Sequence, residues 1–270
     1  MRTLSAEELL EYAEQYGLKD GLAQRDYVAV RVAHAIASDP SVASVIAIKG
    51  GFALRYGYGS PRTSKDIDGT IGTKHGALDP KRLQRVVRGQ CSDLGITFDP
   101  KDPQIGVDSL DFGNIVYVGP IGRGSLTLEM SYREDLILPP RRLTIDAFGV
   151  PKFEIRALAI DEMIAEKWRC LVQRSPRKPG DPYDLWFLWA DFRNRKPRSA
   201  DDLIDGAMVK KLIPQKVVLH DGGVTLIKML DQYRSAWPAA IGQTVPSDAP
   251  PFDDVRRAVL QAAKAWTPWR

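Results

Sequence analysis

The stretch Val45–Ile71, VIAIKGGFALRYGYGSPRTSKDIDGTI, predicts a buried strand, a glycine turn that opens a helix, a loop and a second strand. The apolar run at its start is long enough for a core strand and too short for a helix. Gly50 and Gly51 follow this run at once. Paired glycines let backbone amides approach a ligand closely, and a helix that begins there directs its free N–H groups at an anion. The order of these elements therefore favours a phosphate site.

Two aspartates lie in the second strand of this stretch. Asp66 and Asp68 alternate with Ile67, so both carboxylates leave one face of the strand while Ile67 points to the other. A phosphate-sized pocket beside two such acids is what metal-dependent phosphoryl transfer requires. Each signal alone is weak, because Gly-Gly is commonly a simple turn and Asp-x-Asp occurs on many surface strands. Their order along the chain favours the functional interpretation.

The composition is that of an ordinary globular protein. At 270 residues, with 44% apolar and 27% charged residues, the chain suits one large domain or two small ones. No apolar run approaches membrane-spanning length, and acids occupy the positions where a secretory signal would be apolar, so we expect a cytoplasmic protein with no membrane partner. Cys91 and Cys170 show no metal or redox spacing. The net charge of +4 permits a polyanionic partner without requiring one.

The patterning predicts an α/β (α+β) fold, with a small mixed sheet and flanking helices followed by an all-helical C-terminal half. We expect domains over 1–155 and 156–270. The expected elements before 155 are helices over about 5–16, 22–38, 52–56 and 79–94, a loop over 95–112, and strands over 114–118, 125–132 and 143–150. The expected helices after 155 cover about 160–174, a segment from 181, and about 200–213, 221–236 and 252–266.

Two polar features of the first half each have a structural and a functional interpretation. In the strand over 125–132, Glu129 alternates with apolar neighbours, so it is either a solvent-facing glutamate or a third carboxylate for the aspartate pair. In the helix over 79–94, Lys81, Arg85 and Arg88 form a basic stripe opposite the apolar one. This stripe is either a solvated helix face or a surface that grips nucleic-acid phosphates.

A second polar segment lies in the helical half. In the helix over 160–174, Lys167 falls at the border of the apolar stripe, where it either extends along the surface to water or is held over a phosphate. Asp181 is a good N-cap for the next helix, with Pro182 at the first helical position. Asp184 then falls in the first turn, where an acid stabilises the helix dipole, so a structural role alone could account for it.

Two of these segments resemble the AbiEii/AbiGii toxin family, a branch of the nucleotidyltransferase fold of the DNA polymerase β type. KGGFAL at 49–54 and RTSKDID at 62–68 are similar to the family's K-G-G-x-A-L turn and R-x-S-x-D-I-D strand. Downstream, Glu162, Glu166-Lys167, Arg174 and Asp181-Pro182-Tyr183-Asp184-Leu185 are similar to its E-x-x-x-E-K, Arg and D-x-Y-D-L pattern. The loop between Arg174 and Asp181 is longer than the family's. The functional acid is therefore Asp181 or Asp184, of which we favour Asp184.

The resemblance implies the site residues. It implies that a strand antiparallel to the D-x-D strand supplies the third acid, and Glu129, followed by Ser131-Tyr132-Arg133-Glu134, fits that position. The implied Mg²⁺ ligands are Asp66, Asp68 and Glu129. The implied nucleotide-binding residues are Lys49, Gly50, Gly51, Arg62, Ser64 and Lys167. The implied catalytic residues are Asp66, Asp68, Glu129, Lys167 and Asp184, the last two reaching the cleft from the helical domain.

The same resemblance implies the activity. It implies a Mg²⁺-dependent nucleotidyltransferase, the toxin of a type IV toxin–antitoxin or abortive-infection system, which transfers NMP from an NTP to RNA. The 3′ end of tRNA is the expected acceptor, GTP and CTP are not distinguished as donors, and a cognate antitoxin encoded nearby is an expected partner. Two alternatives stay open at this point. One is transfer to a small-molecule hydroxyl such as that of an antibiotic, and the other is a non-catalytic NTP-binding protein on the same scaffold.

Overall fold

The computed structural model describes residues 2–71, 77–132, 136–174, 178–193, 224–242, 244–245 and 249–265. Contacts within the chain divide it into two compact units, Met1–Leu158 and Ala159–Arg270. The first unit holds every described strand, and the described part of the second unit is helical. The sequence thus correctly predicted a mixed α/β fold with a small sheet.

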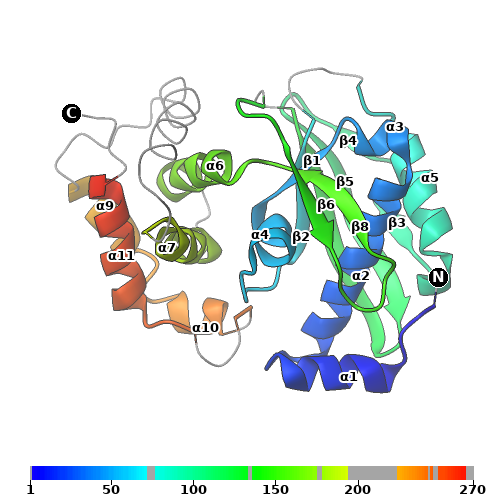
Figure 1. Ribbon diagram of the computed structural model, residues 1–270, viewed down its shortest axis with the longest axis horizontal. Coiled ribbons are helices and arrows are strands. Elements are labelled where there is room, and N and C mark those ends of the chain that lie inside the picture. Colours follow the sequence, from blue (N-terminus) through cyan, green and yellow to red (C-terminus); the bar gives the residue numbers. More distant parts are fainter. Residues whose placement is uncertain are drawn as a thin grey trace. The chain divides into compact units, whose positions relative to one another are not determined.

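The first unit is built on one mixed sheet of eight strands (Figure 1). The strands are β1 (Ala47–Lys49), β2 (Asp66–Thr70), β3 (Thr97–Asp99), β4 (Gln104–Ile105), β5 (Ser109–Gly119), β6 (Gly122–Ser131), β7 (Arg141–Ile145) and β8 (Phe153–Ala157). Their order is β3-β5-β6-β2-β1-β8-β7, and β4 pairs with β5. β2 therefore lies at the centre of the sheet, between β1 and β6.

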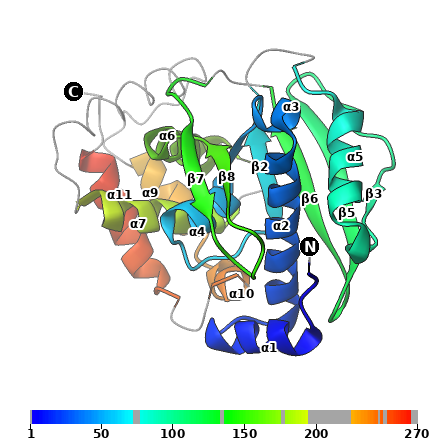
Figure 2. The ribbon, with the colours of Figure 1, turned by 45° about the vertical axis from the view of Figure 1, so that its right-hand side comes forward.

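Helices of the first unit cover the sheet. They are α1 (Ala6–Gln15), α2 (Asp20–Ser38), α3 (Pro40–Ala43), α4 (Gly50–Tyr58), α5 (Pro80–Gln90) and the 3-10 turn η1 (Ser92–Leu94). Figure 2 shows α2 and α5 lying side by side over the sheet, and α2 contacts both β6 and β8. A capping box formed by Ser5 and Glu8 opens α1. A left-handed Gly59, with φ 75°, ends α4.

The two faces of the sheet differ in character. Ile67, Leu128 and Met130 point to one face, and all three are fully buried. The alternating positions Asp68 and Glu129 point to the opposite face. This alternation explains why the central strands tolerate acids. The apolar side chains on one face of each strand pack in the core, and the acidic side chains lie on the other face.

A buried ion pair joins two helices of the first unit. The Arg55 guanidinium of α4 lies 2.7 Å from the Asp26 carboxylate of α2, whose side chain is 2% exposed. Arg55 also donates to the Pro61 carbonyl at 2.7 Å and to the Tyr12 hydroxyl at 3.2 Å. Burial raises the pKa of Asp26 to about 6, and Arg55 opposes this shift. The pair therefore fixes α4, the helix that follows the glycine turn, against α1 and α2.

Three expectations about the first unit are wrong. The segment 95–112 is not a loop, because it contains β3, β4 and the start of β5; its glycines and prolines separate strands too short to give a period-two pattern. The strand expected over 143–150 is β7, which begins at Arg141 and ends at Ile145 before a turn in which Phe148 has φ 56°. The helix expected over 79–94 ends at Gln90, and the 3-10 turn follows it.

The second unit packs its described helices around an apolar centre. They are α6 (Ile160–Gln173), α7 (Gly180–Arg193), α9 (Val224–Asp231), α10 (Trp237–Ile241) and α11 (Phe252–Ala265). α7 contacts both α6 and α11, and Trp168, Leu185 and Val259 are fully buried among them. The helix expected over 200–213 lies outside the described residues. Within the described residues, no helix combines the length and apolar character needed to cross a membrane.

The buried Asp26–Arg55 pair leads to a prediction about stability. Replacing Asp26→Ala removes the whole carboxyl group and leaves the buried Arg55 guanidinium with no acceptor on α2, which should lower the free energy of unfolding by about 3–5 kcal/mol. Chemical denaturation at pH 7 measures this loss. The matched control is Glu154→Gln, which removes the exposed pair with Arg142 at 3.1 Å and should cost less than about 1 kcal/mol.

The same variant should also change how stability depends on pH. The folded Asp26 carboxyl holds its proton up to about pH 6, whereas the unfolded carboxyl releases it near pH 3.8. The folded state binds the extra proton between these values, so this group makes the free energy of unfolding fall as pH rises through them. Asp26→Ala should lack this part of the slope. An identical slope in the variant and the parent protein would contradict the assignment.

Candidate active site

The glycine turn brings the chain backbone unusually close to the aspartate strand. β1 ends at Lys49, and α4 begins at Gly50 in the left-handed region, with φ 67°. A Cβ atom on Gly50 would lie 2.8 Å from the Oδ2 atom of Asp68. Only glycine accepts both the dihedral angle and the close approach. Glycine at position 50 is therefore required by the geometry of the turn.

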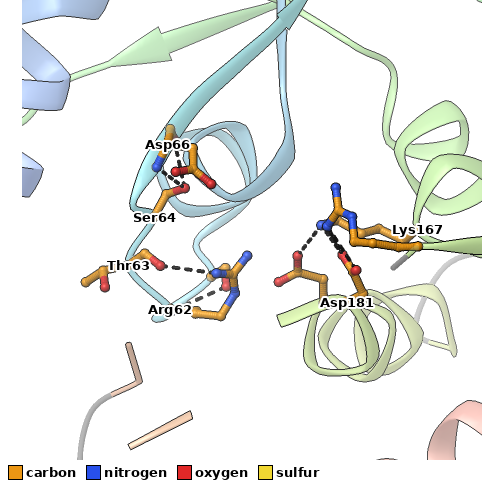
Figure 3. A network of polar contacts seen from close by, with 9 residues as sticks. Arg62, Thr63, Ser64, Asp66, Lys167 and Asp181 are labelled. Atoms are coloured by element: carbon orange, nitrogen blue, oxygen red, sulfur yellow. Dashed lines mark hydrogen bonds and ion pairs between the residues drawn. The ribbon is translucent and has the colours of Figure 1, made fainter. Parts of the chain in front are cut away.

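Gly51 is crowded from another direction. A Cβ atom on Gly51 would lie 2.8 Å from Nη2 of Arg62 and 2.8 Å from Oγ of Ser64. Figure 3 shows how these side chains are held: Ser64 Oγ donates to the Asp66 carbonyl oxygen at 2.8 Å, and Arg62 Nη1 donates to the Thr63 carbonyl oxygen at 3.2 Å. The start of α4, a guanidinium and a hydroxyl thus meet at one point. Free helix N–H groups, a cation and a hydroxyl are the donors that a phosphate group takes.

The register of the strands aligns the predicted acids. Asp68 lies directly opposite Glu129 of β6 and directly opposite Lys49 of β1, and Asp66 lies opposite Thr127. Directly opposed residues on neighbouring strands point to the same face. The structure therefore brings Lys49, Asp68 and Glu129 together in one row across three strands, with Asp66 on the same face two residues away.

The direction of the third strand corrects one expectation. The resemblance implied that the strand carrying Glu129 would run antiparallel to the D-x-D strand, but β6 runs parallel to β2. The alignment of Glu129 with Asp68 survives this correction, because alternation along β6 is the same in either direction.

Asp111 is an acid on this face that the sequence analysis did not identify. It lies directly opposite Glu129 on β5, so it shares the face of Asp68 and Glu129. Its Oδ1 accepts the backbone N–H of Gly113 at 2.7 Å, where the ladder between β5 and β6 is interrupted. Asp111 fell within the segment interpreted as a loop. The alternation Leu110-Asp111-Phe112, with both apolar residues buried, was the signal that could have revealed it.

The carboxylates share a face but do not converge on one point. Within the part of the chain that the structure describes, no group of three or more His, Cys, Asp or Glu side chains is arranged to hold a metal ion. The backbone supplies the alignment, and rotation of side chains such as the exposed Glu129 would have to supply the convergence. The donor set is made of oxygen ligands, which suits a hard divalent cation.

The second unit contains a buried network of charges between α6 and α7. Lys167 Nζ lies 2.7 Å from Oδ2 of Asp184, which is fully buried, and 3.1 Å from Oδ1 of Asp181 (Figure 3). The Lys167 side chain is itself only 13% exposed. Lys167 therefore does not extend along the surface to water. Its ammonium group is held in place by two carboxylates.

Asp181 belongs to the same network and does not act as the expected N-cap. α7 begins at Gly180, so Asp181 lies in the first helical turn. Its carboxylate accepts two hydrogen bonds from Arg174 Nη1, at 3.0 and 3.2 Å, in addition to that from Lys167. Asp181 of α7 thus binds Lys167 of α6 and also Arg174, the residue at the C-terminal cap of α6. Burial raises the pKa of the nearby Cys170 thiol, and the Asp181 charge adds to that shift.

The basic stripe on α5 has local partners. Arg82, beside the stripe, pairs with Asp39 at 2.9 Å, and Arg85 pairs with Asp79 at 3.5 Å. The Arg88 guanidinium lies over the Phe98 ring, 5.1 Å from its centroid. These contacts favour the interpretation of this stripe as a solvated helix face.

Comparison with known proteins assigns this architecture to a class: the protein is a nucleotidyltransferase. The chain belongs to the family of nucleotidyl transferase AbiEii toxins of type IV toxin–antitoxin systems, whose sequence profile matches residues 34–259. Membership of a toxin–antitoxin system implies an antitoxin partner and a nucleotide substrate. No curated protein sequence matches the chain.

Solved structures support the fold. MenT4, a nucleotidyltransferase toxin from Mycobacterium tuberculosis H37Rv, is similar with a TM-score of 0.62 and 18% identity over 95% of this chain and 88% of that one. JHP933 from Helicobacter pylori is similar with a TM-score of 0.57 and 16% identity over 92% of this chain and 93% of that one. At these identities the likeness shows a shared fold.

The crowding at the glycine turn leads to a prediction about activity. Gly51→Ala should displace the Arg62 and Ser64 side chains and lower nucleotide transfer at least tenfold, about 1.4 kcal/mol in transition-state free energy. The fold should persist, because the displaced atoms are the ends of side chains. Steady-state transfer rates and thermal unfolding measure the two effects.

A helical glycine elsewhere provides the control for this variant. Gly89 of α5 has open space where a Cβ atom would lie. Gly89→Ala should leave transfer unchanged and stabilise the helix by up to about 1 kcal/mol. Equal transfer rates in Gly51→Ala and Gly89→Ala would refute the role of the turn.

Proposed function

We propose that the protein transfers a nucleoside monophosphate from an NTP to RNA, with Mg²⁺ held by Asp66, Asp68 and Glu129. The observation that carries the proposal is the register of β1, β2 and β6, which aligns acids of two strands beside the glycine turn. Carboxylate oxygens are the ligands Mg²⁺ prefers. Bound there, Mg²⁺ would supply positive charge to the triphosphate and the leaving pyrophosphate.

The residues around the glycine turn bind the phosphates in this proposal. Lys49 does not cap α4 with its side chain, so the amides of Gly50 and Gly51 stand at the positive end of an uncapped helix. Arg62 adds a planar set of donors, and Ser64 adds a hydroxyl next to Gly51. Lys49, on the face of Asp68, adds a second cation. The crowding at Gly51 supports this assignment, because it gathers these donors without an intervening side chain.

We assign Lys167 and Asp184 to the same reaction. The acceptor hydroxyl oxygen forms a bond to the α-phosphorus, the bond from that phosphorus to the pyrophosphate oxygen breaks, and the hydroxyl proton passes to Asp184. Lys167 is a compact cation suited to neutralise charge on a phosphoryl group. Their ion pair at 2.7 Å supports a joint role, since each orients the other.

We propose RNA as the acceptor on the basis of the family resemblance. The cytoplasm, where NTPs and tRNA occur, is the proposed place of action. A toxin that modifies the 3′ end of tRNA is the most specific form of the proposal. The net charge of +4 is compatible with RNA. Incubating the purified protein with each radiolabelled NTP and total cellular RNA tests the acceptor, with small hydroxylated compounds in parallel. Label in acid-insoluble RNA is the expected result, and label only in a small molecule would replace RNA as the acceptor.

The acidic face leads to a prediction about transfer. Asp66→Ala should abolish nucleotide incorporation, because one of three proposed metal ligands is lost. The fold should persist, because removing Asp66 also removes repulsion from Asp68. Incorporation of labelled NTP and thermal unfolding measure the two effects. Asp102→Ala, an exposed aspartate outside this face, is the control and should keep full activity. Full incorporation by Asp66→Ala would end the metal assignment.

The choice between Asp181 and Asp184 leads to a further prediction. Asp184→Asn should lower the rate of transfer by about a hundredfold or more, the usual size of effect for a group that accepts a proton in the transition state. Asp181→Asn should chiefly lower stability, because Arg174 and Lys167 both depend on that carboxylate. Transfer rates and melting temperatures of both variants distinguish the roles. The reverse pattern, with Asp181→Asn inactive but stable, would make Asp181 the functional acid.

A further inference from the structure

An aromatic groove lies on the first unit. It encloses about 590 Å³ between α1, the C-terminal end of α4 and the turn after β7. Its walls include Tyr12 of α1, Tyr16 at the C-terminal cap of α1, and Phe148 of the turn. Their rings are in contact, with centroids 4.5 Å apart for Tyr12 and Tyr16 and 4.3 Å apart for Tyr12 and Phe148.

The backbone of the groove is strained at Phe148. This residue has φ 56°, the left-handed region that a bulky side chain rarely adopts, and it is the only non-glycine residue with positive φ in the described chain. Strain of this kind costs of the order of 1–3 kcal/mol and is found mainly where a ligand or switch requires it. Here it turns the Phe148 ring towards Tyr12 and Tyr27.

The charges around the groove disfavour an anionic ligand. The one cation in its lining, Arg55, is already engaged by Asp26, Pro61 and Tyr12. Asp146 also lines the groove and is exposed, and among the described residues it has no ion-pair partner.

The neighbouring helix adds negative charge. α1 carries four glutamates and no basic residue, and Glu11 stands one turn before Gln15 of the lining. Phosphates of RNA would be repelled here, whereas a positive group would be attracted.

We propose that this groove binds a basic segment of a partner protein. An arginine side chain of that segment lies against the exposed Tyr16, which is 46% accessible, and Phe148, with its guanidinium facing Asp146. A planar guanidinium stacks well on aromatic faces and pairs with carboxylates. The acidic surface of α1 attracts the rest of the segment. This inference does not depend on the proposed nucleotide transfer.

The test uses the full-length protein and a fluorescein-labelled peptide of alternating glycine and arginine, with fluorescence anisotropy as the readout. The same peptide with citrulline in place of arginine keeps the shape and loses the charge. The arginine peptide should bind at least tenfold more tightly than the citrulline peptide. Tyr16→Ala and Asp146→Asn should each weaken binding of the arginine peptide about threefold, as expected for one exposed cation–π contact or one exposed ion pair.

Matched variants separate this site from the acidic sheet face. Asp102→Asn, an exposed aspartate outside the groove, and Asp66→Ala should both bind the arginine peptide as the parent protein does. Tyr16→Ala should keep full nucleotide transfer, so a failure of this inference and a failure of the proposed function give different results. Melting temperatures confirm that each variant is folded.

Two outcomes would overturn the proposal. The first is equal binding of the arginine peptide by the parent protein, Tyr16→Ala and Asp146→Asn. The second is that these groove variants instead lose binding of a fluorescein-labelled oligouridylate, which would make the groove an RNA site.

Discussion

The positions of the polar groups around the acidic face depend on the absence of a Cβ atom at Gly50 and at Gly51. Because no Cβ atom stands between them, the start of α4 can approach Asp68 on one side and Arg62 and Ser64 on the other. The same turn ends β1 and so fixes where Lys49 lies relative to the central strand. Behind it, the buried Asp26–Arg55 pair holds α4 in place. The position of a few polar groups is thus set by backbone packing several residues away.

In the second unit, a network of buried ion pairs fixes the positions of the polar side chains. Lys167, Asp181 and Asp184 are almost entirely withdrawn from water, and Arg174 completes the set. Charges removed from water are costly unless each has a partner, so such a network tolerates only a narrow range of arrangements. It restricts an otherwise flexible lysine to one position. Hydrogen bonding here supplies the rigidity that glycine packing supplies in the first unit.

The sequence alone predicted the central part of the fold and missed its periphery. The strand, the glycine turn and the Asp66–Asp68 strand were recoverable, because their residue types leave few alternatives. Glu129 was found from its alternation with apolar neighbours. The segment 95–112 was misjudged because β3 and β4 are too short to show a period, and Asp111 was lost with it. The direction of β6 is set by tertiary pairing, which no local pattern encodes. The Lys167 network was equally beyond reach, since spacing showed only that this lysine borders an apolar stripe.

The parallel pairing of β2 with β6 has a consequence for how activity arises. Two parallel neighbours cannot be joined by a tight hairpin, so the chain must travel back through α5, β3 and β5 before Glu129 comes alongside Asp68. Contacts between segments so distant along the chain form late in folding. Closing the long loop between them costs conformational entropy before the contacts themselves can stabilise the fold. A ribosome-bound fragment that ends before β6 would carry the glycine turn and the aspartate pair yet lack the full acidic row. The row of acids is therefore complete only once synthesis has passed that strand.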